Sequence, residues 1–207
     1  MRTLHVDDPD AIDAAVAALR AGEVVVVPTD TVYGLAARPD DAGAVDTIYR
    51  AKHRPDKLPL PVLAATLDQV RQLGVAFSDA AVTLATRWWP GPLTMAFGFS
   101  PAVPRPPWLE DREEVAVRIP QHAFLLALTQ RTGVLVVTSA NRHGAATPAT
   151  AGEAASQLAP HVGLAIDGGV LDGVPSTLVN VRATEPVIER TGAIARRDID
   201  AALRDGA

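Results

Sequence analysis

VVVVPTDTVYGLAARPDDAGAVDTIYRAKHR, residues 24–54, indicates a buried strand followed by a polar loop and a helix. The run from Val24 to Val27 is β-branched and apolar at every position, which is typical of a strand covered on both faces. Pro28 ends the strand because proline has no N–H for a sheet hydrogen bond. Thr29-Asp30-Thr31 then supplies short polar side chains at the carboxyl end of the strand, where open α/β sheets bind ligands. We therefore expect a ligand site at this edge.

The helix that begins after Asp41 brings two cations to the same region. Its apolar residues recur at the spacing of one buried face: Val45, Ile48 and Tyr49. Lys52 and Arg54 follow at its C-terminal end. Two interpretations are open at this point, because these cations could serve the polar loop or could simply offset the helix dipole and face solvent.

Other segments repeat this pattern. Leu135 to Val137 indicates a second buried strand, and it also ends in polar residues, at 138–141. Two strands with hydroxyl-rich ends suggest one shared pocket.

Arg118 interrupts the apolar strand at 115–119, and a guanidinium there needs a partner. The partner could be a ligand or a structural carboxylate such as Asp167.

Composition limits the class of protein. The chain has 207 residues, 48% hydrophobic and 21% charged, which fits one well-buried domain. A formal charge of −5 argues against a surface that coats nucleic acid. The absence of cysteine excludes disulfides and thiolate chemistry, and no apolar run predicts a membrane span. P-loop, dinucleotide-binding and zinc-protease motifs are missing, and the five histidines lack metal-ligand spacing, so no metal site is expected.

The fold class expected from the pattern is α/β, with a mixed, twisted sheet and helices packed around it. Predicted helices cover residues 8–22, 67–73, 78–88, 122–132, 150–159 and 197–203, besides the helix after Asp41. Further strands are expected at 93–99, 115–119, 164–169, 176–181 and 186–190. The proline-rich stretch 58–64 predicts an edge strand or extended loop, and residues 101–107 predict a mobile or irregular loop.

Several short motifs occur together in a fixed order. They are PTDTVYGL (28–35), KHRP (52–55), WWPGPLT (88–94), VAVRIP (115–120), TSAN (138–141), STLV (176–179) and RTGAI (190–194). In this order they resemble the YrdC family of threonylcarbamoyl-AMP synthases over nearly the whole chain. The resemblance implies a single YrdC-like domain over residues 1–207, with a motif-bearing core of about 9–194 and a large concave face.

The resemblance also implies an activity. A family member would be an L-threonylcarbamoyladenylate synthase, a nucleotidyltransferase that joins L-threonine, bicarbonate or CO₂, and ATP. The products are threonylcarbamoyl-AMP and pyrophosphate, and the former is used for threonylcarbamoyladenosine in tRNA. ATP is a substrate and would carry Mg²⁺ with it. A tRNA-modifying transferase complex would receive the intermediate in the cytoplasm, with no membrane involved, and weak direct binding of tRNA stays open.

The family's functional residues map onto this sequence position by position. The resemblance implies that Lys52 and Arg54 are the catalytic cations on the phosphates, that threonine is bound by Thr31, Arg118 and Ser176, and that ATP is bound by Lys52, Arg54, Ser139, Asn141, Thr147 and Arg190.

Four positions depart from the family pattern. Leu58 and Leu63 stand where an asparagine and a histidine are usual, and Pro175 replaces a glutamate. Glu114 stands where a small hydroxyl residue is common, and a carboxylate there would repel phosphate unless it points away or meets magnesium. These changes leave the amino-acid specificity open. Two alternatives therefore remain: a related adenylating or carbamoyl-transfer enzyme with another acceptor, and a non-catalytic RNA-binding module.

Overall fold

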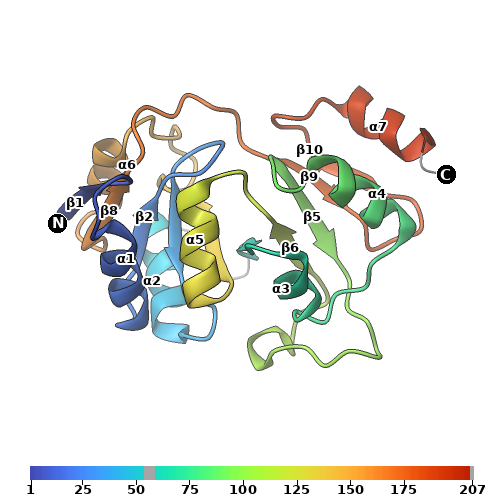
Figure 1. The fold of residues 1–207 in the computed structure, drawn as a ribbon, viewed down its shortest axis with the longest axis horizontal. Coiled ribbons are helices and arrows are strands. Elements are labelled where there is room, and N and C mark those ends of the chain that lie inside the picture. Colours follow the sequence, from blue (N-terminus) through green and yellow to red (C-terminus); the bar gives the residue numbers. More distant parts are fainter. Residues whose placement is uncertain (54–58, 206–207) are drawn as a thin grey trace.

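A ten-stranded mixed β-sheet runs through the computed structural model, which describes residues 1–53 and 59–205 (Figure 1). Its strands are β1 (Arg2–His5), β2 (Val25–Val27), β3 (Gly34–Ala37), β4 (Val62–Leu63), β5 (Leu93–Phe97), β6 (Val115–Arg118), β7 (Leu135–Ser139), β8 (Leu164–Asp167), β9 (Thr177–Asn180) and β10 (Val187–Arg190). They lie in the order β1-β8-β2-β3-β7-β4-β6-β5-β9-β10. The helices are α1 (Ala11–Arg20), α2 (Ala42–Lys52), α3 (Leu67–Arg71), α4 (Asp79–Trp88), the 3₁₀ helix η1 (Pro107–Leu109), α5 (Ala123–Thr132), α6 (Ala151–Leu158) and α7 (Arg196–Asp205). The predicted fold class is confirmed.

The valine run of β2 is covered on both of its faces. Val25 and Val27 pack into a core with α1 and α5, which lie side by side (Figure 1). Val24 and Val26 belong to the core on the opposite face, which includes Ile48 of α2. Because successive strand residues point to opposite faces, an uninterrupted apolar run is what this two-sided burial requires.

β3 was not predicted, since residues 29–40 were interpreted as a loop. It pairs antiparallel with β2, with Val27 opposite Gly34, and antiparallel with β7, with Gly34 opposite Ser139. β2 and β7 therefore flank β3 and run in the same direction, so their polar ends leave the sheet at the same edge. This explains physically why the two hydroxyl-rich strand ends are neighbours.

β4 lies in the interior of the sheet, so the prediction of an edge strand was wrong. It is two residues long, parallel to β6 and antiparallel to β7. Proline beside a central strand is tolerated here because Pro61 uses its carbonyl, which accepts a hydrogen bond from the Val137 N–H at 2.9 Å. This short strand joins the half of the sheet that contains β2 to the half that contains β5 and β9.

Side chains cap several of the helix starts. Asp41, Ser78 and Thr150 each accept a hydrogen bond from the N–H three residues later. The start of α1 was predicted wrongly: the helix begins at Ala11, and the carboxylate of Asp8 instead accepts from the His5 N–H at 2.7 Å. That contact ties Asp8 to β1, a strand that was also missed.

Residues 168–176, which we call the strap, cross from β8 to β9 (Figure 1). The strap passes very close to the loop after β2. A Cβ atom built on Gly173 would lie 2.2 Å from the Thr31 carbonyl oxygen, and one on Gly168 would lie 2.7 Å from the Pro28 side chain. Glycine is therefore required at both positions for the strap to lie against residues 28–31.

The loop at 101–107 is irregular, as predicted, and it is held by one side chain. The Arg105 guanidinium donates to the carbonyls of Glu110 and Arg112, at 2.5 and 2.8 Å, and lies over the ring of Phe99 at 4.7 Å. These contacts anchor the loop to β5 and to the start of β6.

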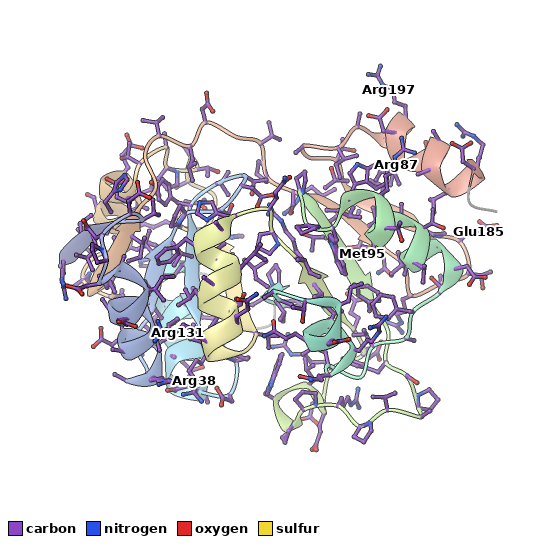
Figure 2. The ribbon with its side chains drawn as sticks, in the orientation of Figure 1. Arg38, Arg87, Met95, Arg131, Glu185 and Arg197 are labelled. Atoms are coloured by element: carbon purple, nitrogen blue, oxygen red, sulfur yellow. The ribbon has the colours of Figure 1, made fainter. Side chains whose placement is uncertain are left out.

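Figure 2 shows several arginines on the outer surface, far from the strap. Arg38 and Arg131 lie beside α2 and α5, whereas Arg87 and Arg197 lie at the opposite end of the molecule by α4 and α7. Arg131 pairs with Asp13 of α1 at 2.6 Å. Within residues 1–53 and 59–205, no helix has the length and apolar character needed to span a bilayer.

Candidate active site

The loop between β2 and β3 is shaped by Thr29. Its hydroxyl accepts from the N–H groups of Thr31 and Val32, both at 3.0 Å, and donates to the Val32 carbonyl at 2.7 Å. Thr29 is thus used by the loop itself. Thr31, which is equally buried, turns its hydroxyl toward β6 and so remains the candidate for contact with a ligand.

Arg118 crosses from β6 to this loop. Its Nη1 donates to Thr31 Oγ1 at 3.0 Å, its Nη2 donates to Asp30 Oδ1 at 2.5 Å, and its Nε donates to the Gly91 carbonyl at 3.0 Å. The ion pair is buried, since the two side chains are 7% and 13% exposed. The structural carboxylate suggested from the sequence was Asp167, and that suggestion is wrong, because Asp30 is the partner.

Ser176 and Arg190 adjoin Arg118. The Arg190 Nη2 donates to the Ser176 carbonyl at 2.9 Å and to its hydroxyl at 3.3 Å. Burial lowers the pKa of the Arg190 guanidinium, and the positive charge of nearby Arg118 lowers that pKa further. We call Asp30, Thr31, Arg118, Ser176 and Arg190 the arginine cluster. It holds one carboxylate against two guanidiniums, so an anionic group would balance its charge.

A second group surrounds Lys52 at the end of α2. Its ammonium is buried, with the residue 2% exposed, and donates to the backbone carbonyls of Ser139 and Asn141 at 2.5 and 2.6 Å. The solvent-facing interpretation of Lys52 is therefore wrong. Asn141 Nδ2 bonds the carbonyls of Arg142 and Ala145, while its buried Oδ1 has no hydrogen-bond partner among the described residues. That oxygen can accept from a ligand.

Both groups flank the same loop. Ala140, between the two polar residues of the second group, donates its N–H to the Tyr33 carbonyl at 2.8 Å, just after Thr31. The sequence-predicted residues thus come together as Thr31 with Arg118, Ser176 with Arg190, and Lys52 with Ser139 and Asn141. Thr147, which follows Asn141 closely in the sequence, is exposed to solvent. Arg54 lies outside the described residues.

A family model for the Sua5/YciO/YrdC domain, described as "Telomere recombination", matches residues 17–192. The chain belongs to the Sua5/YciO/YrdC family. It is 38% identical over 202 residues to a threonylcarbamoyl-AMP synthase of Bacillus subtilis, covering 97% of this chain and 58% of the relative. This chain therefore spans little more than half of that protein.

Solved structures of family members have the same fold. The structure of P. abyssi Sua5 complexed with L-threonine matches with a TM-score of 0.87 at 33% identity, covering 98% of this chain and 61% of that one. E. coli YciO matches with a TM-score of 0.79 at 28% identity, covering 92% and 94% of the two chains. The Sua5/YciO/YrdC fold thus includes proteins of similar length and longer ones.

Tyr33 of the family motif PTDTVYGL forms hydrogen bonds with the first residues of the strap. Its single hydroxyl proton is shared between the Gly169 carbonyl at 2.6 Å and the Asp167 carboxylate at 3.1 Å, and its oxygen accepts from the Gly168 N–H at 3.0 Å. Burial raises the pKa of Tyr33 to about 12, with the neighbouring Asp167 adding to the rise. The phenol therefore stays protonated and keeps donating, which fixes the start of the strap.

Sequence reasoning placed Asp30 among the polar residues of the expected ligand site without naming its partner, and it gave no site role to His122. His122 precedes α5, and its buried Nδ1 has no hydrogen-bond partner within the described part of the chain. Burial lowers the pKa of His122, and the charge of nearby Asp30 opposes that shift. The aspartate of the PTDT motif was a signal for the site, whereas nothing in the spacing of His122 marked it.

The departures from the YrdC pattern can now be located, except Leu58, which lies outside the described residues. Leu63 is 4% exposed, packs in the core beside α1 and α5, and is paired with Arg118 across β4 and β6. Glu114 accepts from Asn180 at 3.2 Å and lies 3.7 Å from Arg182, so its charge is partly balanced. Pro175, at the end of the strap, accepts from the Ala193 N–H at 3.0 Å.

Proposed function

We propose that this protein is an L-threonylcarbamoyladenylate synthase, which converts L-threonine, bicarbonate or CO₂, and ATP into threonylcarbamoyl-AMP and pyrophosphate. Family membership supports this proposal, as do the name of the Bacillus relative and the L-threonine complex of the P. abyssi protein. We further propose that residues 1–207 act as a single domain.

The arginine cluster is the observation that carries the proposal. Its two guanidiniums exceed its single carboxylate by one charge, and guanidinium groups are suited to binding a carboxylate in a partly buried site. The amino acid's carboxylate would lie against Arg118 and Ser176, with the Thr31 hydroxyl beside it. The substrate would supply the missing negative charge, and the burial of Arg118 and Ser176 limits the water that would screen it.

The nucleotide would lie on the Lys52 side of the loop. We propose that Lys52 and Arg54 offset the charge of the phosphates, and that Ser139, Asn141, Thr147 and Arg190 complete the nucleotide site. The Oδ1 of Asn141 has no hydrogen-bond partner in the described part of the chain, which supports the presence of a donor-bearing ligand there. Arg190 bonds Ser176 and lies near Arg118, so it could contact both substrates.

The reaction needs positioning and charge stabilisation more than a nucleophilic residue. The amino group of threonine takes up CO₂, and the resulting N-carboxylate attacks the α-phosphate of ATP in line, releasing pyrophosphate. Mg²⁺ would arrive with ATP as part of that substrate. Among the described residues, no group of three or more His, Cys, Asp or Glu is placed to hold a metal ion.

Threonylcarbamoyl-AMP must then pass to an acceptor. We propose a tRNA-modifying transferase complex as the receiver, in the cytoplasm, where ATP and tRNA are both present. Any direct contact with tRNA would be weak, because the net charge of −5 gives little general attraction to phosphate.

The test is pyrophosphate release from ATP and Mg²⁺ with each of L-threonine and bicarbonate present or omitted. Release should require both, and mass spectrometry should detect threonylcarbamoyl-AMP. Arg118→Lys should raise the KM for threonine, whereas Arg131→Lys, in the exposed pair with Asp13, should not. Release that is independent of threonine would refute the assignment.

A related enzyme with a different acceptor is the second candidate, and Leu63 is the observation that favours it. This residue is buried in the core, so it adds no polar group to the amino-acid pocket. A panel of amino acids and carbamoyl phosphate, assayed under the same conditions, separates the two candidates. Faster pyrophosphate release with another acceptor than with threonine would favour the second.

A further inference from the structure

Thr94 contacts the arginine cluster through Ser176. It lies on β5, is 4% exposed, and its hydroxyl is 2.7 Å from the hydroxyl of Ser176. The parallel pairing of β5 with β9 sets Thr94 beside Leu178, so Ser176, two residues before Leu178, lies diagonally across from Thr94 on the same face. The contact is therefore fixed by the sheet.

The hydrogen bonds of Ser176 limit the direction of this contact. A hydroxyl can donate once and accept twice, whereas a guanidinium can only donate. Arg190 donates to the Ser176 hydroxyl at 3.3 Å and thus occupies one acceptor position. The remaining question is whether Thr94 donates to Ser176 or accepts from it.

Thr94 and Ser176 are 4% and 6% exposed, so either direction leaves one buried proton, and the two directions differ in where that proton lies. If Thr94 accepted, its own proton would stay inside the strand layer, where Ser176 is its hydrogen-bond partner among the described residues. An unpaired polar group in such a place is costly. If Thr94 donates, the proton left over belongs to Ser176, which lies at the end of the strap beside the two guanidiniums.

We propose that Thr94 is a positioning residue that makes Ser176 a hydrogen-bond donor to the carboxylate of the amino-acid substrate. The inference rests on the proposed function and adds a residue to it. Thr94 and Arg190 then occupy both acceptor positions of Ser176. The proton of Ser176 is left to point to the place in the arginine cluster where a negative charge is lacking. A donor polarised by a guanidinium forms a stronger hydrogen bond to an anion.

The experiment compares Thr94→Val, which keeps the shape and removes the donor, with Thr94→Ser, which keeps the hydroxyl. Calorimetric titration with L-threonine and initial rates of pyrophosphate release are measured for both. Thr94→Val should raise the Kd and KM for threonine by about tenfold or more, the effect of one hydrogen bond to a charged group. Thr94→Ser should restore affinity, while kcat and the KM for ATP should change by less than about threefold in both variants.

Thr129→Val is the matched control. Thr129 is fully buried, and its hydroxyl donates within α5 to the Leu125 carbonyl at 2.7 Å. Its loss should lower the thermal midpoint and leave threonine affinity unchanged. Equal loss of affinity in Thr94→Val and Thr94→Ser, or unchanged affinity in Thr94→Val, overturns the inference.

Failure of the proposed function gives a different result. If the natural protein binds threonine and releases no pyrophosphate, that function fails, and the two Kd values still decide the role of Thr94. If the natural protein binds no threonine, both ideas fail.

Discussion

Replacing Arg118 with methionine should lower the free energy of unfolding by about 3–5 kcal/mol, the cost of breaking a buried ion pair from one side. The guanidinium donates to Asp30, Thr31 and the Gly91 carbonyl, and methionine donates to none of them. The Asp30 carboxylate, 13% exposed, would keep its charge without a partner. In a domain whose total stability is about 5–15 kcal/mol, this is a large fraction.

Urea unfolding followed by circular dichroism measures the effect. With a denaturant slope of about 2–3 kcal/mol/M, the midpoint should fall by about 1–2.5 M. Adding Asp30→Asn to the Arg118→Met variant removes the unpaired charge and should recover about 1–3 kcal/mol. The recovery distinguishes an electrostatic cost from loss of packing.

Arg131→Met is the control for loss of an arginine as such. Its pair with Asp13 has side chains 48% and 70% exposed, so its removal should cost under about 1 kcal/mol. Equal midpoint shifts for Arg118→Met and Arg131→Met would refute the reasoning, and so would a double variant less stable than the single one.

Three further predictions concern the surroundings of the cluster. Lys52→Met should cost about 2–4 kcal/mol in urea unfolding, because two buried carbonyls lose a charged donor; an unchanged midpoint would contradict this. Because burial lowers the pKa of His122 in the folded protein, the unfolded chain binds the proton more readily, and stability should fall as the pH drops below the unfolded value of about 6.5. Thermal midpoints of His122→Asn between pH 5 and 7.5 should therefore depend less on pH than those of the natural protein, and parallel curves would count against it. Gly173→Ala should destabilise by about 1–3 kcal/mol and raise the KM for threonine, since the new Cβ would lie 2.2 Å from the Thr31 carbonyl oxygen; normal kinetics and stability would show that the strap can move aside.

The elements that sequence predicted well are those with a strong local signal. The valine run predicted β2, and the helices expected after Asp41 and from residues 78 and 150 begin where side chains of Asp41, Ser78 and Thr150 cap them. β3 was missed because GLAA carries little strand propensity and is held by its two neighbours. β4 was placed at an edge because its prolines suggested one, whereas its position follows from pairing with distant strands.

The candidate site divides in the same way. The motifs marked Thr31, Arg118, Ser176 and Lys52, which lie together in pairs or groups as described. The partners of these residues could not be predicted from sequence spacing. Asp30 is next to Thr31 in the sequence, yet its ion-pair partner is Arg118 on β6. The contact of Thr94 with Ser176 likewise joins residues far apart in the sequence. Side-chain partners across a sheet depend on register, which a single sequence specifies weakly.

The brevity of β4 has a mechanical consequence for ligand binding. Thr31 belongs to the β2 half of the sheet, and Ser176 and Arg190 belong to the β9 half. One small molecule bound by all three would therefore link the two halves, which are otherwise joined through the two-residue strand β4. Slower amide hydrogen exchange at Leu63 of β4 on adding threonine would be the signature of that link.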